Sequence, residues 1–169
     1  MISMAIATCF LAACKSNSGT KSSSDSTATA IKRNKQIALD AEMSISKQDM
    51  DGLFKNCSAD FVDYGNGDSK PMKNVDSIKA DFKGFLTAFP DFKGEDLAAI
   101  ADSNTVVVTG NWSGTFKNDY MKMKANGKSF KIPEADIFTF NNEGKITSHK
   151  SVQSGIYIFY QLGFLVPKK

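Results

Sequence analysis

Four ionisable residues near the end of the chain could carry acid–base or nucleophilic chemistry: Glu134, Asp136, His149 and Lys150. A carboxylate among apolar side chains has a raised pKa, as proton abstraction near neutral pH requires. Asp136 is therefore the best candidate for a catalytic acid or base, and Glu134 is the second. Lys150 could act as an amine nucleophile if an apolar pocket removed its proton. A salt bridge between Asp136 and Lys150 is the alternative, and it would hold both side chains charged and inert.

These residues lie in a stretch that predicts a β-hairpin. Residues 130–140 and 145–154 read as two strands, and the polar segment Asn141–Gly144 joins them. This composition suits a type I turn with Gly144 in the left-handed region as a bulge. If Asn141 pairs with Lys145, Asp136 faces Lys150 and both share one face of the sheet. A slip of one residue would reverse the faces of the second strand.

In this register the hairpin face that should turn inward mixes apolar and charged side chains. Charged groups are costly to bury unless they are paired or reach water. A water-containing cavity relieves that cost and leaves room for a ligand. We therefore predict an internal cavity, and its predicted lining is Trp112, Asp136, Phe138, Phe140 and Lys150, with Phe61, Asp63 or Tyr64 reaching it from an earlier strand. The same register places His149 on the outer face, as a surface histidine.

The elements that must position this cavity follow one another in a simple order. Apolar spacing predicts three helices, at 31–47, at about 47–56 and at 75–89, the last capped by Asn74. Short strands are predicted at 61–64, 92–101, 105–113 and 120–124. In the strand at 105–113 the even positions are apolar, so Trp112 should point inward. Helices followed by an antiparallel meander predict an α+β fold with a curved sheet wrapped around helices.

Composition excludes several classes of function. The net charge of +3 is small and no basic cluster forms a stripe, so nucleic-acid binding is not expected. The sequence contains no cluster of histidine or cysteine, so a metal site is not predicted. No cofactor is expected either. Cys57 is the one cysteine within the expected folded domain, where we interpret it as a half-buried structural thiol.

The N-terminal residues predict an envelope lipoprotein. Residues 1–14 are apolar but too short to span a bilayer, and they read as a signal peptide. The segment Leu11–Cys14 resembles the bacterial lipoprotein box, which implies lipidation of Cys14. Residues 15–30 are polar and predict a disordered tether, followed by one folded domain at 31–169. Because Lys15 follows the cysteine where an inner-membrane retention signal has aspartate, the outer membrane of a bacterium is the expected location.

Five short motifs in order suggest a family. They are Ala-Phe-Pro-Asp at 88–91, Trp-Ser-Gly-Thr at 112–115, Asp-Ile-Phe-Thr-Phe at 136–140, Gly-Lys-Ile at 144–146 and Gln-Leu-Gly at 161–163. Together they resemble the SnoaL-like polyketide cyclase and ester cyclase branch of the nuclear-transport-factor-2-like superfamily, over about residues 31–167. The resemblance implies a cone-shaped, cystatin-like roll, with three N-terminal helices packed on a strongly curved, mostly antiparallel sheet around a pocket.

Departures from the family pattern concern its catalytic positions. Ester-cyclase-type members often carry histidine where this chain has Phe116, and often carry tryptophan and aspartate on the last strand, where it has Lys150 and Ser154. A fold hosts many functions, so the resemblance does not carry catalysis over. The first hypothesis is a membrane-tethered domain that binds a small apolar or amphipathic ligand at Tyr64, Trp112, Phe138, Phe140 and Lys150. The alternative is a cofactor-independent cyclase or isomerase that uses Asp136 or Glu134.

The outer face of the sheet predicts self-association. Family members often dimerise there, and Val107, Ala135 and Ile137 offer apolar area on that face. A homodimer is therefore expected.

Overall fold

The computed structural model describes residues 23–67 and 70–166. The predicted signal peptide, Cys14 and residues 15–22 of the predicted tether lie outside these ranges. Three helices come first in the chain, α1 (Ser23–Ser46), α2 (Met50–Phe54) and, after strand β1, α3 (Val75–Ala88). The strands are β1 (Cys57–Asp63), β2 (Lys93–Asp102), β3 (Thr105–Thr115), β4 (Ser129–Phe140) and β5 (Ile146–Val152), and α4 (Gly155–Gln161) follows them.

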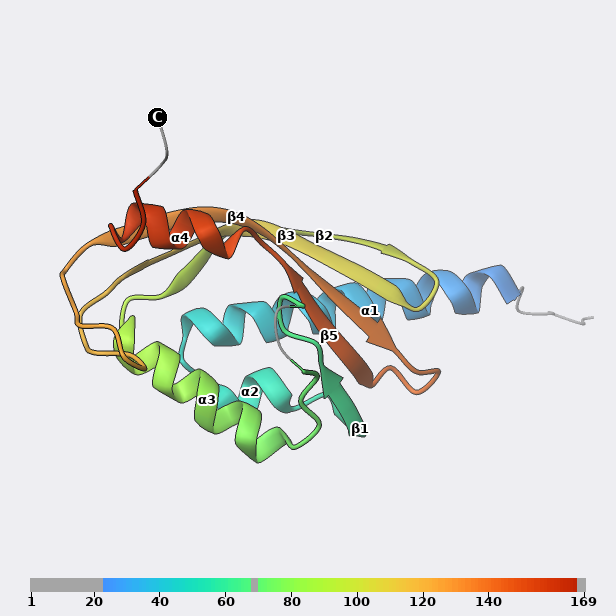
Figure 1. The fold of residues 1–169 in the computed structure, drawn as a ribbon. Coiled ribbons are helices and arrows are strands. Elements are labelled where there is room, and N and C mark those ends of the chain that lie inside the picture. Colours follow the sequence, from blue (N-terminus) through green and yellow to red (C-terminus); the bar gives the residue numbers. More distant parts are fainter. Residues whose placement is uncertain (1–22, 68–69, 167–169) are drawn as a thin grey trace, which may run out of the picture.

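The strands form one mixed sheet in the order β1-β5-β4-β3-β2. β1 pairs with β5 in parallel, and the other pairs are antiparallel. The sheet arches over the three N-terminal helices (Figure 1). The predicted α+β class and helix-then-sheet layout are therefore confirmed. Within the described residues, no helix is long and apolar enough to cross a membrane.

The helices largely follow the predicted pattern. Asn74 caps α3 by accepting a hydrogen bond from the backbone N–H of Ser77 at 2.8 Å, as predicted. α1 buries Ala38 and Ala41, whereas Met43 is exposed. α1 also begins at Ser23 rather than Ile31, so residues 23–30 of the predicted tether are helical.

Two local predictions were wrong. The segment 120–124 forms only one isolated bridge, between Tyr120 and Met123, and not a strand. Only strands were expected after residue 89, yet the helix α4 follows β5. Gln161 in α4 accepts a hydrogen bond from the Lys131 N–H at 2.9 Å and donates one to the Lys131 carbonyl at 3.1 Å. The Gln161 side chain thus supplies hydrogen-bond partners for the backbone of β4 beyond the point where β5 ends.

The hairpin turn is as predicted, but the register after it is not. Gly144 has φ of +79°, and the Asn141 N–H donates to the Lys145 carbonyl. Phe140 pairs with Ile146 as expected, but Thr139 then pairs with Ser148, so Thr147 is an extra residue. This bulge in β5 reverses the faces of every later residue on that strand.

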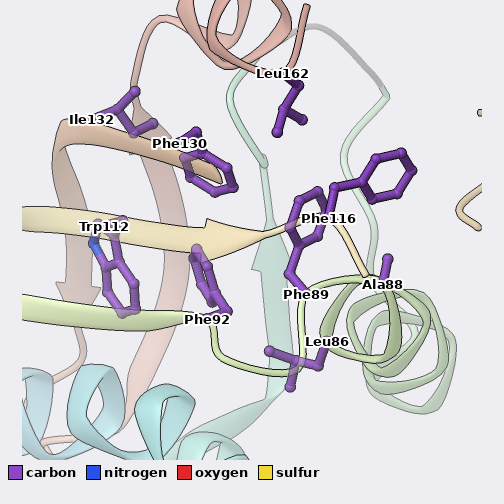
Figure 2. Packing of buried hydrophobic residues seen from close by; sticks show 9 residues of the cluster. All are labelled: Leu86, Ala88, Phe89, Phe92, Trp112, Phe116, Phe130, Ile132 and Leu162. Carbon is purple, nitrogen blue, oxygen red and sulfur yellow. The ribbon is translucent and has the colours of Figure 1, made fainter. Parts of the chain in front are cut away.

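Aromatic residues fill the core beside the end of β3 and the start of β4. Phe92 stacks on Trp112 with ring centroids 4.9 Å apart, and Phe89 stacks on Phe116 at 5.2 Å (Figure 2). Trp112 is 2% exposed, so its predicted inward orientation is confirmed. A second buried cluster lies beside the start of β3 and the end of β4, and it includes Phe61, Ile78, Phe138 and Ile146.

Candidate functional site

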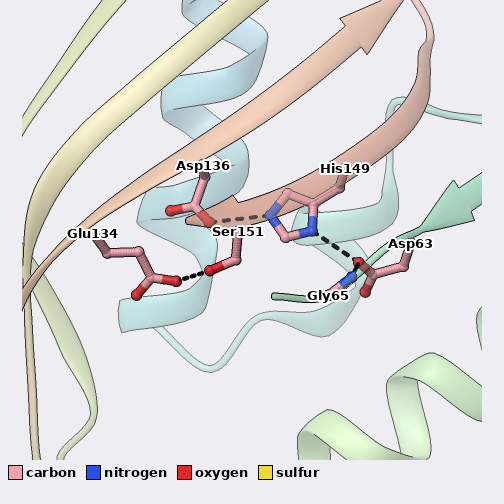
Figure 3. Close-up of polar contacts among 6 residues, drawn as sticks. All are labelled: Asp63, Gly65, Glu134, Asp136, His149 and Ser151. Atoms are coloured by element: carbon pink, nitrogen blue, oxygen red, sulfur yellow. Dashed lines mark hydrogen bonds and ion pairs between the residues drawn. The ribbon is translucent and has the colours of Figure 1, made fainter. Parts of the chain in front are cut away.

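His149 lies between two aspartates on the inner face of the sheet. Its Nδ1 is 3.0 Å from Oδ1 of Asp63 at the end of β1, and its Nε2 is 3.1 Å from Oδ1 of Asp136 on β4 (Figure 3). Asp63 also accepts a hydrogen bond from the Gly65 N–H, which fixes its carboxylate. With a carboxylate at each ring nitrogen, the doubly protonated imidazole can donate a hydrogen bond on both sides, so this arrangement favours the cationic form.

This placement corrects the predicted pairing of Asp136 with Lys150. The bulge at Thr147 turns His149 inward and Lys150 outward, and β4 residue Ile137 is the one that pairs with Lys150. Lys150 is exposed, so it lies on the opposite face from Asp136 and the predicted salt bridge is wrong. The prediction of an outward His149 was wrong for the same reason.

A second polar pair continues the same face. The Ser151 hydroxyl donates to Oε1 of Glu134, and Ser151 is buried. Ser151 lies two residues after His149 on β5, and Glu134 lies two residues before Asp136 on β4. Alternation along the two strands therefore places all four side chains on one face (Figure 3).

Glu42 joins this group from α1, on the helical layer under the sheet. It is 1% exposed, and its Oε2 has no hydrogen-bond partner among the residues that the structure describes. Glu42, Asp136 and His149 each offer a ligand atom, and these atoms lie within 4.8 Å of one another. Sequence reasoning missed Glu42, although it follows Ala38 by four residues and precedes Ile45 by three, which is the spacing of a buried helical face.

Burial and charge shift the protonation of this cluster. Burial alone would lower the pKa of His149, but the hydrogen bonds and charges of Asp136 and Asp63 outweigh it and raise that pKa to about 10. Burial raises the pKa of Glu42 well above its usual range, and the charge of Asp136 adds to the effect. Burial and the Asp136 charge also raise the pKa of Glu134 to about 7.

Asp63 shows the opposite shift. Burial would raise its pKa, but the contacts with His149 and the Gly65 N–H lower it below the usual value. The inner face therefore holds an imidazolium beside ionised Asp63, together with a carboxyl at Glu42 that favours its neutral form.

A small cavity of about 80 Å³ opens beside this cluster. Its polar walls are Glu42, Asp63 and His149. Its other walls come from α1, α2, β1, α3, β4 and β5, and they are Ile45, Leu53, Phe54, Cys57, Phe61, Ile78, Phe82, Phe138 and Ile146. Cys57 is half-buried, and burial, then the charge of Asp63, raises the pKa of its thiol to about 11, as suits an unreactive structural thiol.

The predicted site residues fall into separate places. Phe138 lines the cavity as predicted, and so do Phe61 and Asp63. Phe140 is buried in the cluster around the cavity without lining it, and Trp112 lies in the other aromatic cluster. Tyr64 is 44% exposed and does not line the cavity. Asp136 and Glu134 do not line the cavity.

Comparisons with known proteins agree with this architecture. The family model described as SnoaL-like polyketide cyclase matches residues 35–162. No curated protein matches the chain.

Solved structures with a similar fold are numerous. AclR from Streptomyces galilaeus, described as a candidate hydroxylase, has a TM-score of 0.70 at 23% identity, covering 80% of this chain and 99% of its own. A candidate polyketide cyclase from Xanthomonas campestris has a TM-score of 0.73 at 13% identity, covering 79% and 98%. A Catenulispora acidiphila protein with a ketosteroid isomerase-like fold, in complex with trimethylamine, has a TM-score of 0.63 at 16% identity, covering 78% and 98%.

Proposed function

Because the chain belongs to the SnoaL-like polyketide cyclase family, we propose that its internal cavity binds a small molecule with an apolar body and one polar end. The observation that carries this proposal is the uneven polarity of the cavity walls. They are apolar except on one side, and Glu42 lies on that side. Glu42 is buried with an oxygen that no described residue satisfies. An unsatisfied buried polar atom is costly, so a ligand that donates a hydrogen bond to it gains affinity.

The size of the cavity limits the ligand. Pockets for drug-sized molecules measure roughly 300–1,000 Å³, whereas this cavity measures about 80 Å³. A ligand the size of a single small ring or a short amphipathic chain suits that volume. A multi-ring polyketide would require Phe54 and Phe82, which are only partly buried, to move aside.

Binding is better supported than the alternative of acid–base catalysis by Asp136 or Glu134. Asp136 is engaged by His149 and Glu134 by Ser151, and neither carboxylate lines the cavity. Phe116, at the position where the family resemblance implies a histidine, is fully buried in an aromatic cluster. Ser154, at the position where the resemblance implies an aspartate, is exposed at the start of α4.

Phenol is a suitable probe, since it combines an aromatic ring with one hydroxyl donor. In protein carrying labelled isoleucine methyl groups, we expect phenol to shift the signals of Ile78 and Ile146, which line the cavity. Ile100 is 69% exposed and serves as the internal control. Saturable shifts at the two cavity residues and none at Ile100 support the proposal.

Two variants sharpen the experiment. Ile78→Phe should fill the cavity and abolish the phenol shifts at Ile146 while the circular dichroism spectrum is retained. Glu42→Gln, which keeps the shape of the side chain, should weaken phenol binding but leave the binding of benzene nearly unchanged. Equal phenol responses in wild type and Ile78→Phe would refute internal binding.

Attachment to a bacterial outer membrane through Cys14 is part of the same proposal. Its support is the apolar run at 1–14, the Leu-Ala-Ala-Cys segment and the polar residues after it. We expect the wild-type chain in the membrane fraction and Cys14→Ser in the soluble fraction, when cells are fractionated without detergent. A wild-type chain that is already soluble would contradict anchoring.

Self-association through the outer sheet face is also proposed. Ile100 pairs with Val107, and Val107 pairs with Ile137, so these three apolar residues form a row across β2, β3 and β4. We expect sedimentation of the Cys14→Ser chain to show a dimer that Ile100→Lys converts to a monomer. Met121→Lys, at an exposed site outside the sheet, is the matched control. A wild-type monomer at high micromolar concentration would exclude this dimer.

A further inference from the structure

We propose that Glu42, Asp136 and His149 form a binding site for a divalent transition-metal ion, with Zn²⁺ as the best-matched ion. The three side chains come from α1, β4 and β5, and their ligand atoms lie within 4.8 Å of one another. One imidazole and two carboxylates make a donor set that zinc accepts, at about 2.0–2.2 Å per bond. Because the three residues are far apart in the sequence, no short sequence motif indicates the metal site.

The present separation of two of the ligand atoms suits an ion. Two ligand atoms on a tetrahedral zinc lie about 3.4 Å apart, given bonds of about 2.0–2.2 Å. Nε2 of His149 and Oδ1 of Asp136 are already 3.1 Å apart. An ion would therefore displace the Nε2 proton and replace the hydrogen bond within this pair with a shift of only a few tenths of an ångström. The Glu42 ligand atom, which lies within 4.8 Å of the other two, would move closer to complete the site.

Glu42 supplies an independent indication of a ligand. Its side chain is 1% exposed, and Oε2 finds no hydrogen-bond donor among the described residues. A buried, unsatisfied carboxyl oxygen calls for an unseen partner such as a water or an ion. Because this oxygen belongs to the residue that faces Asp136 and His149, a cation bound between the three side chains would satisfy it.

The surroundings of His149 are those of a metal-ligating histidine. Such residues almost always give their other ring N–H to a carboxylate or carbonyl, which fixes the tautomer and the ring orientation. Asp63 occupies this place, with Oδ1 3.0 Å from Nδ1 (Figure 3). Asp63 is therefore a positioning residue, and His149 would bind the metal through Nε2.

The cavity provides access to one side of the site. Glu42 and His149 both line it, so an ion held between them would keep a coordination position towards the cavity. Three protein ligands with one open position are the pattern of zinc sites that bind an exogenous molecule. In the metal-bound protein the polar end of a cavity ligand would bind at that position on the ion, instead of donating a hydrogen bond to Glu42.

Cobalt(II) and zinc titrations of the full-length chain test the site directly. We expect one equivalent of Co²⁺ to give the intense visible absorption of a tetrahedral ion, and one equivalent of Zn²⁺ to remove it. Absence of a strong thiolate-to-cobalt band would separate this site from the three cysteines of the chain. Mg²⁺ in excess should not displace the cobalt, because it prefers an octahedral oxygen shell.

Variants that keep side-chain shape identify the ligands. Glu42→Gln and Asp136→Asn should each weaken Zn²⁺ binding about tenfold or more, and Asp63→Asn should weaken it by about 10- to 100-fold and alter the cobalt spectrum. Lys150→Ala, on the opposite face, should change neither. Circular dichroism reports whether each variant folds.

The wild-type chain also gives a test that no variant can confound. Anomalous scattering at the zinc edge from crystals grown with Zn²⁺ should place one ion between the three side chains. Absence of that ion, or zinc affinity unchanged in a folded Glu42→Gln variant, would overturn the proposal. The cluster would then be held together by hydrogen bonds alone, without a metal ion.

Discussion

Nε2 of His149 and Oδ1 of Asp136 lie 3.1 Å apart across the hairpin of β4 and β5. The contact exists because Thr147 bulges out of β5 and reverses the faces of the residues after it. Without the bulge, Lys150 would face Asp136. One extra residue therefore decides whether the inner face carries a flexible lysine or an imidazole held at both ring nitrogens.

This contact predicts unequal effects of two neighbouring substitutions. Asp136→Asn removes the charge that balances His149 in a buried setting, and hydrogen bonds to charged groups contribute about 1.5–3 kcal/mol. We expect the free energy of unfolding to fall by about that amount in urea titrations. Lys150→Ala, at an exposed site, should change it by no more than about 0.5 kcal/mol. A larger loss for Lys150→Ala than for Asp136→Asn would contradict the observed register.

Two glycines predict opposite effects of substitution by alanine. A Cβ on Gly110 would lie 2.5 Å from Cδ2 of Leu97 and 3.1 Å from the carbonyl oxygen of Glu95. Gly110→Ala should therefore destabilise the protein by about 1–3 kcal/mol through overpacking. At Gly84, in the middle of α3, the nearest atom would be Cε2 of Tyr120 at 3.7 Å.

Gly84→Ala should instead stabilise the protein by about 0.5–1 kcal/mol, because glycine is a poor helix former. Thermal melting of the two variants beside the wild type checks both signs. A melting temperature of Gly110→Ala at or above that of wild type would show that Leu97 can move freely.

Stability should fall as the pH rises above neutral. The folded-state pKa of His149 is about 10, above the usual value of about 6.5. Its contribution is therefore full below about pH 6.5 and is lost as the pH rises towards 10. Glu134, whose folded pKa is about 7, acts in the same direction between about pH 4.3 and 7.

Urea unfolding between about pH 6.5 and 9 checks this slope, since each unit of pKa shift is about 1.4 kcal/mol. Asp136→Asn removes the strongest of the contacts that raise the pKa of His149, so it should flatten the profile. A wild-type profile that rises over this range would contradict the assigned partners of His149.

Much of the fold could be predicted from local patterns. The cap at Asn74, the left-handed Gly144 and the alternation that turns Trp112 inward all depend on residues close in sequence. The chain's membership of the family agrees with five short motifs. Local pattern failed at Tyr120–Lys124, where alternation was too short to distinguish a strand from a loop.

The candidate site was predicted only in part. Asp136, Glu134 and Asp63 were recognised because carboxylates stand out among apolar strand residues. The bulge at Thr147 has no proline or glycine to mark it, so the positions of His149 and Lys150 were exchanged. Glu42 was missed because a helical glutamate is ordinarily exposed, and its burial depends on a sheet that forms from residues far along the chain.

The titration of His149 tests the central claim most directly, because it is the only histidine among the 169 residues. Nuclear magnetic resonance of chelator-treated protein should show one imidazole, doubly protonated and held by Asp63 and Asp136. We predict that its ring nitrogen and carbon shifts stay constant from about pH 5 to 9, as a pKa near 10 requires. A titration with a midpoint near pH 6.5, typical of a solvated side chain, would place His149 on the outer face and contradict the inner-face cluster.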